Sequence, residues 1–188
     1  YRRQRQMCIR DSLPGSDLKN IFPAMEFLTA SNRKGLGDKV EDFDNGTLNA
    51  ENKNVVVIGG GNTAMDCCRS SLRLGAEDVK VTVRSPFDQM KASEWEKEEA
   101  MDEGIPIHEI HVPKRFVMNN GKLAGVEFEK VEAVFDDNGK RSLVPTGEEP
   151  VIFECDDVLM AIGQDNAFHW IERDIGIEFG EWDMPTID

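Results

Sequence analysis

Residues 55–64 read Val-Val-Val-Ile-Gly-Gly-Gly-Asn-Thr-Ala, and this stretch decides the fold class. Four consecutive apolar, mostly β-branched residues predict a strand that is buried on both faces, as in a parallel sheet. Three glycines end the strand, and helix-compatible residues then continue from Asn62 to Leu74, just before Gly75. A second β-rich run follows at Val79–Val83. The order of strand, glycine turn, helix and strand predicts a βαβ unit of about 30 residues.

The glycine turn fits the pattern G-x-G-x-x-G/A, which binds dinucleotides when it joins a strand to a helix. Gly59 would allow the tight turn, Gly61 would let the backbone approach a pyrophosphate, and Ala64 would let the helix pack closely. Free N–H groups and the helix dipole would bind the phosphates. The expected cradle consists of Gly59, Gly60, Gly61, Asn62, Thr63 and Ala64. The alternative is a glycine turn that only packs the helix and binds no ligand.

Three further residues near this unit are candidates for ligand contact. Asp66 is expected in the first helical turn, where a carboxylate offsets the helix dipole; contact with the ligand or a partner loop is the alternative. Arg84 follows the second strand, where a carboxylate would bind the ribose 2′-OH of NAD. An arginine there favours the 2′-phosphate of NADP, with Ser85 as a second contact. NAD, or use of both cofactors, remains open if Arg84 is only a solvated cation.

Hairpin signals dominate the second half of the chain. Ser93 predicts a helix N-cap with Glu96 as its capping-box partner, and this helix should end at Gly104. A tight turn is expected at Asn119-Asn120-Gly121, and another at 136–139. Strands are expected at 105–112, 115–118, 123–134, 151–154 and 158–162. The predicted fold class is α/β: a Rossmann-type βαβ domain followed by an antiparallel β-meander.

The histidines and cysteines predict no metal or redox centre. His108 and His111 are three residues apart, but on one strand they would face opposite sides, which argues against a shared metal. The four cysteines form no C-x-x-C pair, so we expect reduced core residues. These cysteines are Cys8, Cys67, Cys68 and Cys155.

Composition limits the partners of this 188-residue chain. Lys and Arg number 22 against 36 Asp and Glu, for a net charge of −14. Such a surface repels polyanions, so we expect no nucleic acid and no membrane as partner. The sequence has no long apolar span and no secretion signal, which predicts a cytoplasmic protein. A phosphate-binding site must therefore be positive locally.

The sequence from 59 to 67, Gly-Gly-Gly-Asn-Thr-Ala-Met-Asp-Cys, resembles the nucleotide motif of the glutamate synthase small (beta) subunit and related flavoprotein oxidoreductases. The resemblance extends over roughly residues 13–188. Gly15–Leu28 is similar to the family's segment before the NADPH domain. Asp156–Gln164 is similar to the strand and turn that lead back to the flavin domain.

The resemblance implies an NAD(P)H-binding domain inserted in an FAD domain. Hydride would pass from the nicotinamide to FAD, and electrons would leave through iron–sulfur clusters to a large catalytic subunit or a ferredoxin-like partner. Ala161 and Gly163 would let the closing turn approach the cofactors without side-chain clash. The hydride chemistry belongs to the cofactors, so we expect no catalytic acid or base in this chain.

The expected organisation has four segments. Residues 1–12 resemble translated adapter sequence and are expected to be a non-native leader, with a basic nucleic-acid-binding arm as the alternative. Residues 13–50 would connect from the FAD domain, 51–165 would form the NAD(P)H-binding domain, and 166–188 would begin the return to the FAD domain.

Two departures from the family matter for function. Many members have two consecutive arginines after the second strand, whereas here Ser85 follows Arg84. The chain also lacks the family's FAD glycine motif, its cysteine-rich cluster domain and its final Gly-Asp flavin motif, so we expect nucleotide binding without turnover by this chain alone. The alternative function is a non-catalytic regulatory nucleotide-binding module. Such a module would continue with βα repeats, and the hairpins here favour the oxidoreductase.

Overall fold

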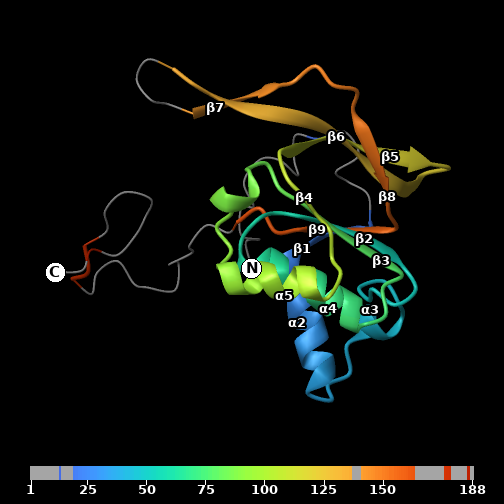
Figure 1. Cartoon of the computed structure of the whole chain (residues 1–188). Helices are drawn as coiled ribbons and strands as arrows, with labels where there is room; N and C mark the ends of the chain where they lie inside the picture. The colour runs from blue at the N-terminus through green and yellow to red at the C-terminus, as the bar shows by residue number, and fades with distance from the viewer. Residues whose placement is uncertain (1–12, 14–18, 137–140, 164–175, 179–185, 187–188) are drawn as a thin grey trace.

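A computed structural model describes residues 13, 19–136, 141–163, 176–178 and 186. Figure 1 shows three layers: helices on one side, a parallel sheet in the middle and an antiparallel sheet on the other side. The strand order in the parallel sheet is β1-β9-β2-β3-β4, and the antiparallel sheet is built around β6. The predicted α/β class with an antiparallel meander is thereby confirmed.

The elements keep the labels of Figure 1. In chain order they are β1 (Ile21–Pro23), α2 (Ala24–Gly35), α3 (Glu41–Asp44), β2 (Asn54–Ile58), α4 (Asn62–Arg73), β3 (Asp78–Thr82), the 3-10 helix η1 (Phe87–Gln89), α5 (Glu94–Asp102), β4 (Ile107–His108), β5 (His111–Asn119), β6 (Lys122–Phe135), β7 (Arg141–Pro145), β8 (Val151–Glu154) and β9 (Asp157–Met160).

Strand β2 lies at the centre of the fold. It pairs in parallel with β3 on one edge and β9 on the other. Val55 and Val57 pack into the core that the sheet shares with the helices, whereas Val56 and Ile58 pack into the core under the meander. Alternate residues of a strand face opposite sides, so both faces of β2 are covered. This confirms the prediction from the continuous apolar run.

The segment before β2 belongs to the same sheet. Ile21–Pro23 is a strand that pairs in parallel with β9. Helix α2 begins directly after Pro23 and continues to Gly35, and the short helix α3 follows it. Phe27 of α2 is buried in the core shared with α4. Residues 21–50 therefore supply an edge strand and two helices to the described fold.

The predicted strand at 105–112 is wrong. It divides at Ile110, whose φ of 56° breaks the extended backbone, into β4 of the parallel sheet and β5 of the meander. His108 and His111 therefore lie on different strands, and their ring centroids are 6.1 Å apart rather than on opposite faces. Among the described residues, no group of three or more His, Cys, Asp or Glu side chains forms a possible metal site.

The meander begins with the predicted hairpin. Asn120 and Gly121 form its two-residue turn with positive φ values of 52° and 76°, and Asn119 pairs with Lys122. The long strand β6 then pairs with β8 along its first half and with β7 along its second half. The sequence did not predict strand β7. The turn expected at 136–139 lies almost entirely outside the described residues. No helix in the described ranges combines the length and apolarity that a membrane span requires.

We predict that the described cysteines are chemically silent in the folded chain. Cys67, Cys68 and Cys155 are free and buried. Burial raises the pKa of all three thiols, that of Cys68 and of Cys155 to about 12. In a Cys8→Ser variant at about pH 8, none of them should react quickly with a disulfide reagent, because thiolate is scarce and access is blocked. Reaction should follow unfolding by guanidinium; fast labelling of the native chain would contradict the described core.

Candidate nucleotide-binding site

The expected site residues meet at the carboxyl edge of the parallel sheet. Gly59 follows β2, Arg84 comes shortly after β3, and Ala161 follows β9. Because these three strands are parallel and adjacent, their carboxyl ends lie side by side. Ligands of open α/β sheets bind at this edge.

Gly59 is required by the packing of the chain itself. Its φ is +150°, and a Cβ built on it would lie 2.3 Å from the carbonyl oxygen of Ala161. Gly60 is also tight, because an added Cβ would lie 2.7 Å from a methyl group of Val83. The glycine turn and the closing turn after β9 are therefore in direct backbone contact.

At Gly61, by contrast, packing does not require a glycine. A Cβ added there would meet no atom of the described residues within 4 Å. The residue is the N-cap of α4, and no acceptor among the described residues pairs with the N–H groups of Asn62 and Thr63. Free N–H groups at a helix start, together with the helix dipole, favour a bound anion. Ala64 is fully buried in the core between helix and sheet.

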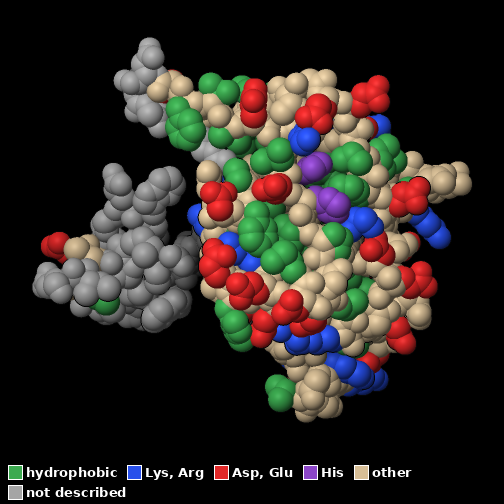
Figure 2. Space-filling model, viewed as in Figure 1, with side chains coloured by type: hydrophobic (Ala, Val, Ile, Leu, Met, Phe, Trp, Pro, Cys, Tyr) green, Lys and Arg blue, Asp and Glu red, His purple; other side chains and the backbone are tan. Residues whose placement is uncertain are grey.

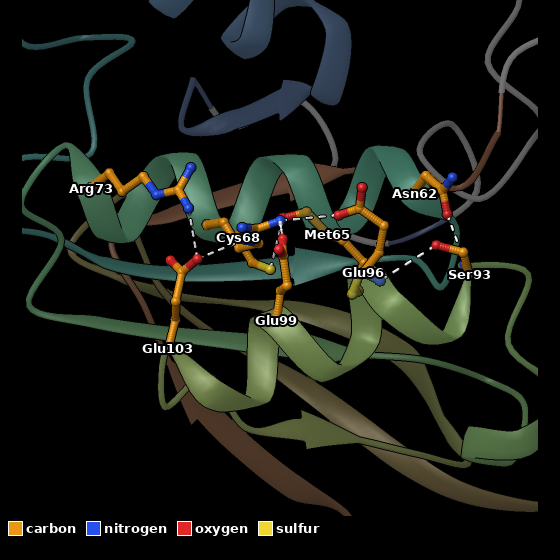
Figure 3. A network of polar contacts seen from close by, with 9 residues as sticks. Asn62, Met65, Cys68, Arg73, Ser93, Glu96, Glu99 and Glu103 are labelled. Atoms are coloured by element: carbon orange, nitrogen blue, oxygen red, sulfur yellow. Dashed lines mark hydrogen bonds and ion pairs between the residues drawn. The ribbon is translucent and has the colours of Figure 1, made fainter.

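The start of α5 supports the glycine turn. The N–H of Ala92 donates to the carbonyl of Gly60 at 2.9 Å, and the N–H of Ser93 donates to Oδ1 of Asn62 at 2.9 Å. Figure 3 shows this last contact, between the first residue of α4 and the N-cap residue of α5. Ser93 Oγ caps α5 by accepting from the N–H of Glu96, but the predicted reciprocal half of the capping box is absent. Asn62 takes that place, and its side chain thus has a positioning role.

An ion-pair cluster fixes α5 along α4. Arg69 of α4 contacts Glu96 at 3.1 Å, Glu103 at 2.8 Å and also Glu99, and its side chain is only 15% exposed. In Figure 3 the three carboxylates point from α5 toward α4. Arg73, one turn after Arg69 on α4, also forms an ion pair with Glu103. The hydrogen bond from Arg69 holds the pKa of Glu103 below its ordinary value of 4.5. We call these five residues the Arg69 clamp.

The remaining predicted residues are more exposed. Asp66 is the fifth residue of α4 and lies beyond the first turn, which contains no acidic residue, so the expectation that it sits in that turn is wrong. Arg84 is exposed, and no carboxylate of the described residues pairs with it. The carbonyl of Ser85 accepts from the N–H of Ile110 at 3.4 Å. Gly163 has a φ of 108°, and a Cβ added there would meet no atom of the described residues within 4 Å.

Lys91 is a further candidate residue that the sequence alone did not indicate. It is exposed and directly precedes Ala92, whose N–H binds the glycine turn. Arg84 and Lys91 therefore begin and end one loop, residues 84–91, at the carboxyl edge of the sheet. The loop carries two cations without carboxylate partners among the described residues. The contact between Ala92 and Gly60 brings Lys91 to the glycine turn, from which it is far apart in sequence.

Comparison with known proteins gives a consistent result. Residues 13–188 match the family described as pyridine nucleotide-disulphide oxidoreductase. The chain is 40% identical over 152 residues to the glutamate synthase [NADPH] small chain of Azospirillum brasilense, covering 80% of this chain and 31% of that protein. It is 37% identical over 132 residues to the NADPH-Fe(3+) oxidoreductase subunit beta of Geobacter sulfurreducens, covering 69% and 20%. The chain thus spans about a third or less of these curated relatives.

Solved structures support the fold. Mycobacterium tuberculosis FprA in complex with NADPH has a TM-score of 0.67 at 17% identity, over 94% of this chain and 50% of that one. Thioredoxin reductase from T. acidophilum has a TM-score of 0.53 at 20% identity, over 73% and 40%. The resemblance predicted from the glycine motif is confirmed by the relatives, and the structures add the Rossmann-like fold.

Two glycines of the turn should respond differently to the same substitution. Gly59→Ala should lower the free energy of unfolding by more than about 1 kcal/mol, because the new methyl group meets backbone at a positive φ. Gly61→Ala should leave stability nearly unchanged but weaken NADPH binding, because the methyl group occupies the side that a pyrophosphate would approach. Thermal denaturation and calorimetric titration measure the two effects. A stable Gly61→Ala chain that binds NADPH as tightly as the parent would contradict the proposed cradle.

The Arg69 clamp makes a second prediction, on stability. Near neutral pH, Arg69→Gln should lower the free energy of unfolding by about 1–2 kcal/mol, because several charge-assisted hydrogen bonds are lost. Arg73→Gln is the matched control and should cost no more than about 0.5 kcal/mol, since Arg73 is exposed and has one partner.

The pH dependence of this loss follows from Glu103. A carboxylate with a lowered pKa stabilises the fold above its ordinary pKa of 4.5 and loses that contribution as the pH falls through the lowered value. The deficit of Arg69→Gln relative to the parent should therefore shrink in acid, as followed by denaturant unfolding at a series of pH values. A deficit independent of pH would show that the charges of the clamp do not stabilise the chain.

Proposed function

Because the chain belongs to the pyridine nucleotide-disulphide oxidoreductase family, we propose that it is the NADPH-binding part of a flavoprotein oxidoreductase that passes hydride from NADPH to FAD. The observation that carries this proposal is the presence of a glycine at position 61. The packing of the chain does not require a glycine there, yet the residue stands at a helix start with free N–H groups. A ligand that must approach the backbone closely explains this choice of residue.

Each part of the edge has a role in this proposal. The N–H groups of Asn62 and Thr63 bind the pyrophosphate, with Gly61 leaving room for it. Arg84 and Lys91 bind the 2′-phosphate, which a chain of net charge −14 would otherwise repel. Ala161 holds the closing turn against the glycine turn and so shapes the floor of the site. Bound NADPH supplies the hydride, and the residues of this chain bind and orient it.

The proposal extends to partners outside this chain. The two relatives are named as a small chain and a beta subunit, which supports assembly of the whole protein with a larger partner. We propose an FAD domain in the same protein as the hydride acceptor. Iron–sulfur clusters would carry electrons on to a catalytic subunit or a ferredoxin-like protein. Ser85, in place of a second arginine, is proposed as a weaker contact to the 2′-phosphate.

Calorimetric titration of the chain with NADPH and NADH tests this assignment. NADPH should bind at least about tenfold more tightly than NADH, a difference near 1.4 kcal/mol. Arg84→Ala and Lys91→Ala should each weaken NADPH binding by roughly three- to tenfold and leave NADH binding almost unchanged, because only NADPH has the 2′-phosphate.

Lys122→Ala is the matched control, because Lys122 is also an exposed cation but lies at the hairpin between β5 and β6. It changes the net charge equally and should preserve the preference for NADPH. If the parent chain binds NADH as tightly as NADPH, the NADPH assignment is wrong. If the folded chain binds neither, the glycine turn does not form a nucleotide site in this chain.

A further inference from the structure

A lysine is completely buried in the helix that supports the glycine turn. The side chain of Lys97 on α5 is 0% exposed. Its Nζ donates to the carbonyl of Phe87 at 3.2 Å and to Oε1 of Glu94 at 2.7 Å, and lies 4.5 Å from the centroid of the Phe87 ring. Burial of an ammonium group is costly, and an apolar side chain would fill the same space without that cost. The position therefore suggests a requirement other than packing.

That requirement is found in the 84–91 loop. Phe87 lies in the middle of the loop, and its N–H donates to Oε2 of Glu109 at 2.7 Å. Its carbonyl accepts from Lys97 and from the N–H of Met90, the latter at 3.3 Å. Lys97 and Glu109 thus hold the backbone of Phe87 from opposite sides of one residue. The two cations of the proposed site, Arg84 and Lys91, lie at the ends of the loop that Phe87 anchors.

We propose that Lys97 is a positioning residue for the recognition of NADPH. Its ammonium group fixes Phe87, and the fixed loop holds Arg84 and Lys91 ready for the same 2′-phosphate. Ordering the two cations in advance lowers the entropy lost on binding. This inference rests on the proposed function and adds to it the residue that makes the chain selective.

The inference separates the two halves of the nucleotide site. The pyrophosphate cradle is formed by α4, and among the described residues the polar contacts of the Lys97 side chain all lie on α5 and the 84–91 loop. Loss of Lys97 should therefore affect the 2′-phosphate alone. NADH, which shares the pyrophosphate but lacks the 2′-phosphate, should be nearly insensitive.

Lys97→Met is the decisive substitution. Methionine is unbranched, fills a similar space and is tolerated in cores, but it can neither donate to the Phe87 carbonyl nor carry a charge. The carboxylate left behind, Glu94, is 74% exposed and stays solvated, and the Phe87 carbonyl still accepts from the N–H of Met90, so the substitution leaves no unpaired buried charge. The melting temperature of the variant should therefore be equal to or above that of the parent, which separates a positioning role from a structural one.

The experiment titrates the full 188-residue chain with NADPH and NADH by calorimetry and measures its melting temperature. In Lys97→Met, NADPH binding should weaken by about five- to tenfold, the loss expected for one anchoring hydrogen bond, while NADH binding stays within about twofold. Glu94→Gln is the control: it neutralises the exposed partner of Lys97 but leaves the contact to Phe87. It should keep the parent's ratio of NADPH to NADH affinity.

The outcomes are distinct. An unchanged affinity ratio in a stable Lys97→Met chain overturns the inference, and so does an equal loss for both nucleotides with a lower melting temperature. If Lys97→Met does not fold, Glu109→Ala serves instead, because it removes the other anchor of Phe87 at an exposed position. An unchanged ratio of NADPH to NADH affinity in Glu109→Ala then overturns the inference. A parent chain without preference for NADPH contradicts the proposed function itself, before any variant is compared.

Discussion

The contact between Gly59 and the carbonyl of Ala161 is the constraint on which the site depends. It locks the end of β2 to the end of β9, two strands that are neighbours in the sheet but about 100 residues apart in sequence. A side chain at Gly59 would separate them, since the added Cβ would lie 2.3 Å from that oxygen. With this contact in place, Gly61 is brought to the start of α4 on an open side of the edge. Packing of the fold thus requires the first glycine but not the second, which we propose is small for the ligand.

A strongly acidic chain can offer a phosphate site because its charges are sorted locally. Arg69 forms ion pairs with the carboxylates that face α4 from α5, among them Glu96 and Glu103, which Figure 3 labels. Arg84 and Lys91 have no carboxylate partner among the described residues. Figure 2 shows acidic, basic and apolar side chains interspersed on the visible face, so no single sign of charge covers it. Charges beyond about 8 Å are largely screened at physiological salt, so the local potential depends on the charges at the loop itself, which are Arg84, Lys91, Asp88 and the nearby Glu109.

The sequence predicts the fold where the signal is local. The apolar run, the glycine turn and the Asn120-Gly121 hairpin are each determined by residues that are adjacent in the chain. Strand β1 was missed because three residues carry no periodicity, and β4 was merged with β5 because an isoleucine at positive φ has no sequence signature. The contact of Asn62 with Ser93 and the place of Lys91 depend on tertiary packing between α4 and α5. Long-range contacts of this kind cannot be read from neighbouring residues.

Titration of the isotope-labelled chain with NADPH, followed through its backbone amide NMR signals, tests the central claim most directly. The account predicts the largest shifts at Gly61, Asn62 and Thr63, whose N–H groups would bind the pyrophosphate, with a second set at Arg84 and Lys91. With NADH, the first set should persist and the second should fade. Binding that shifts signals elsewhere and leaves the start of α4 unchanged would contradict the account.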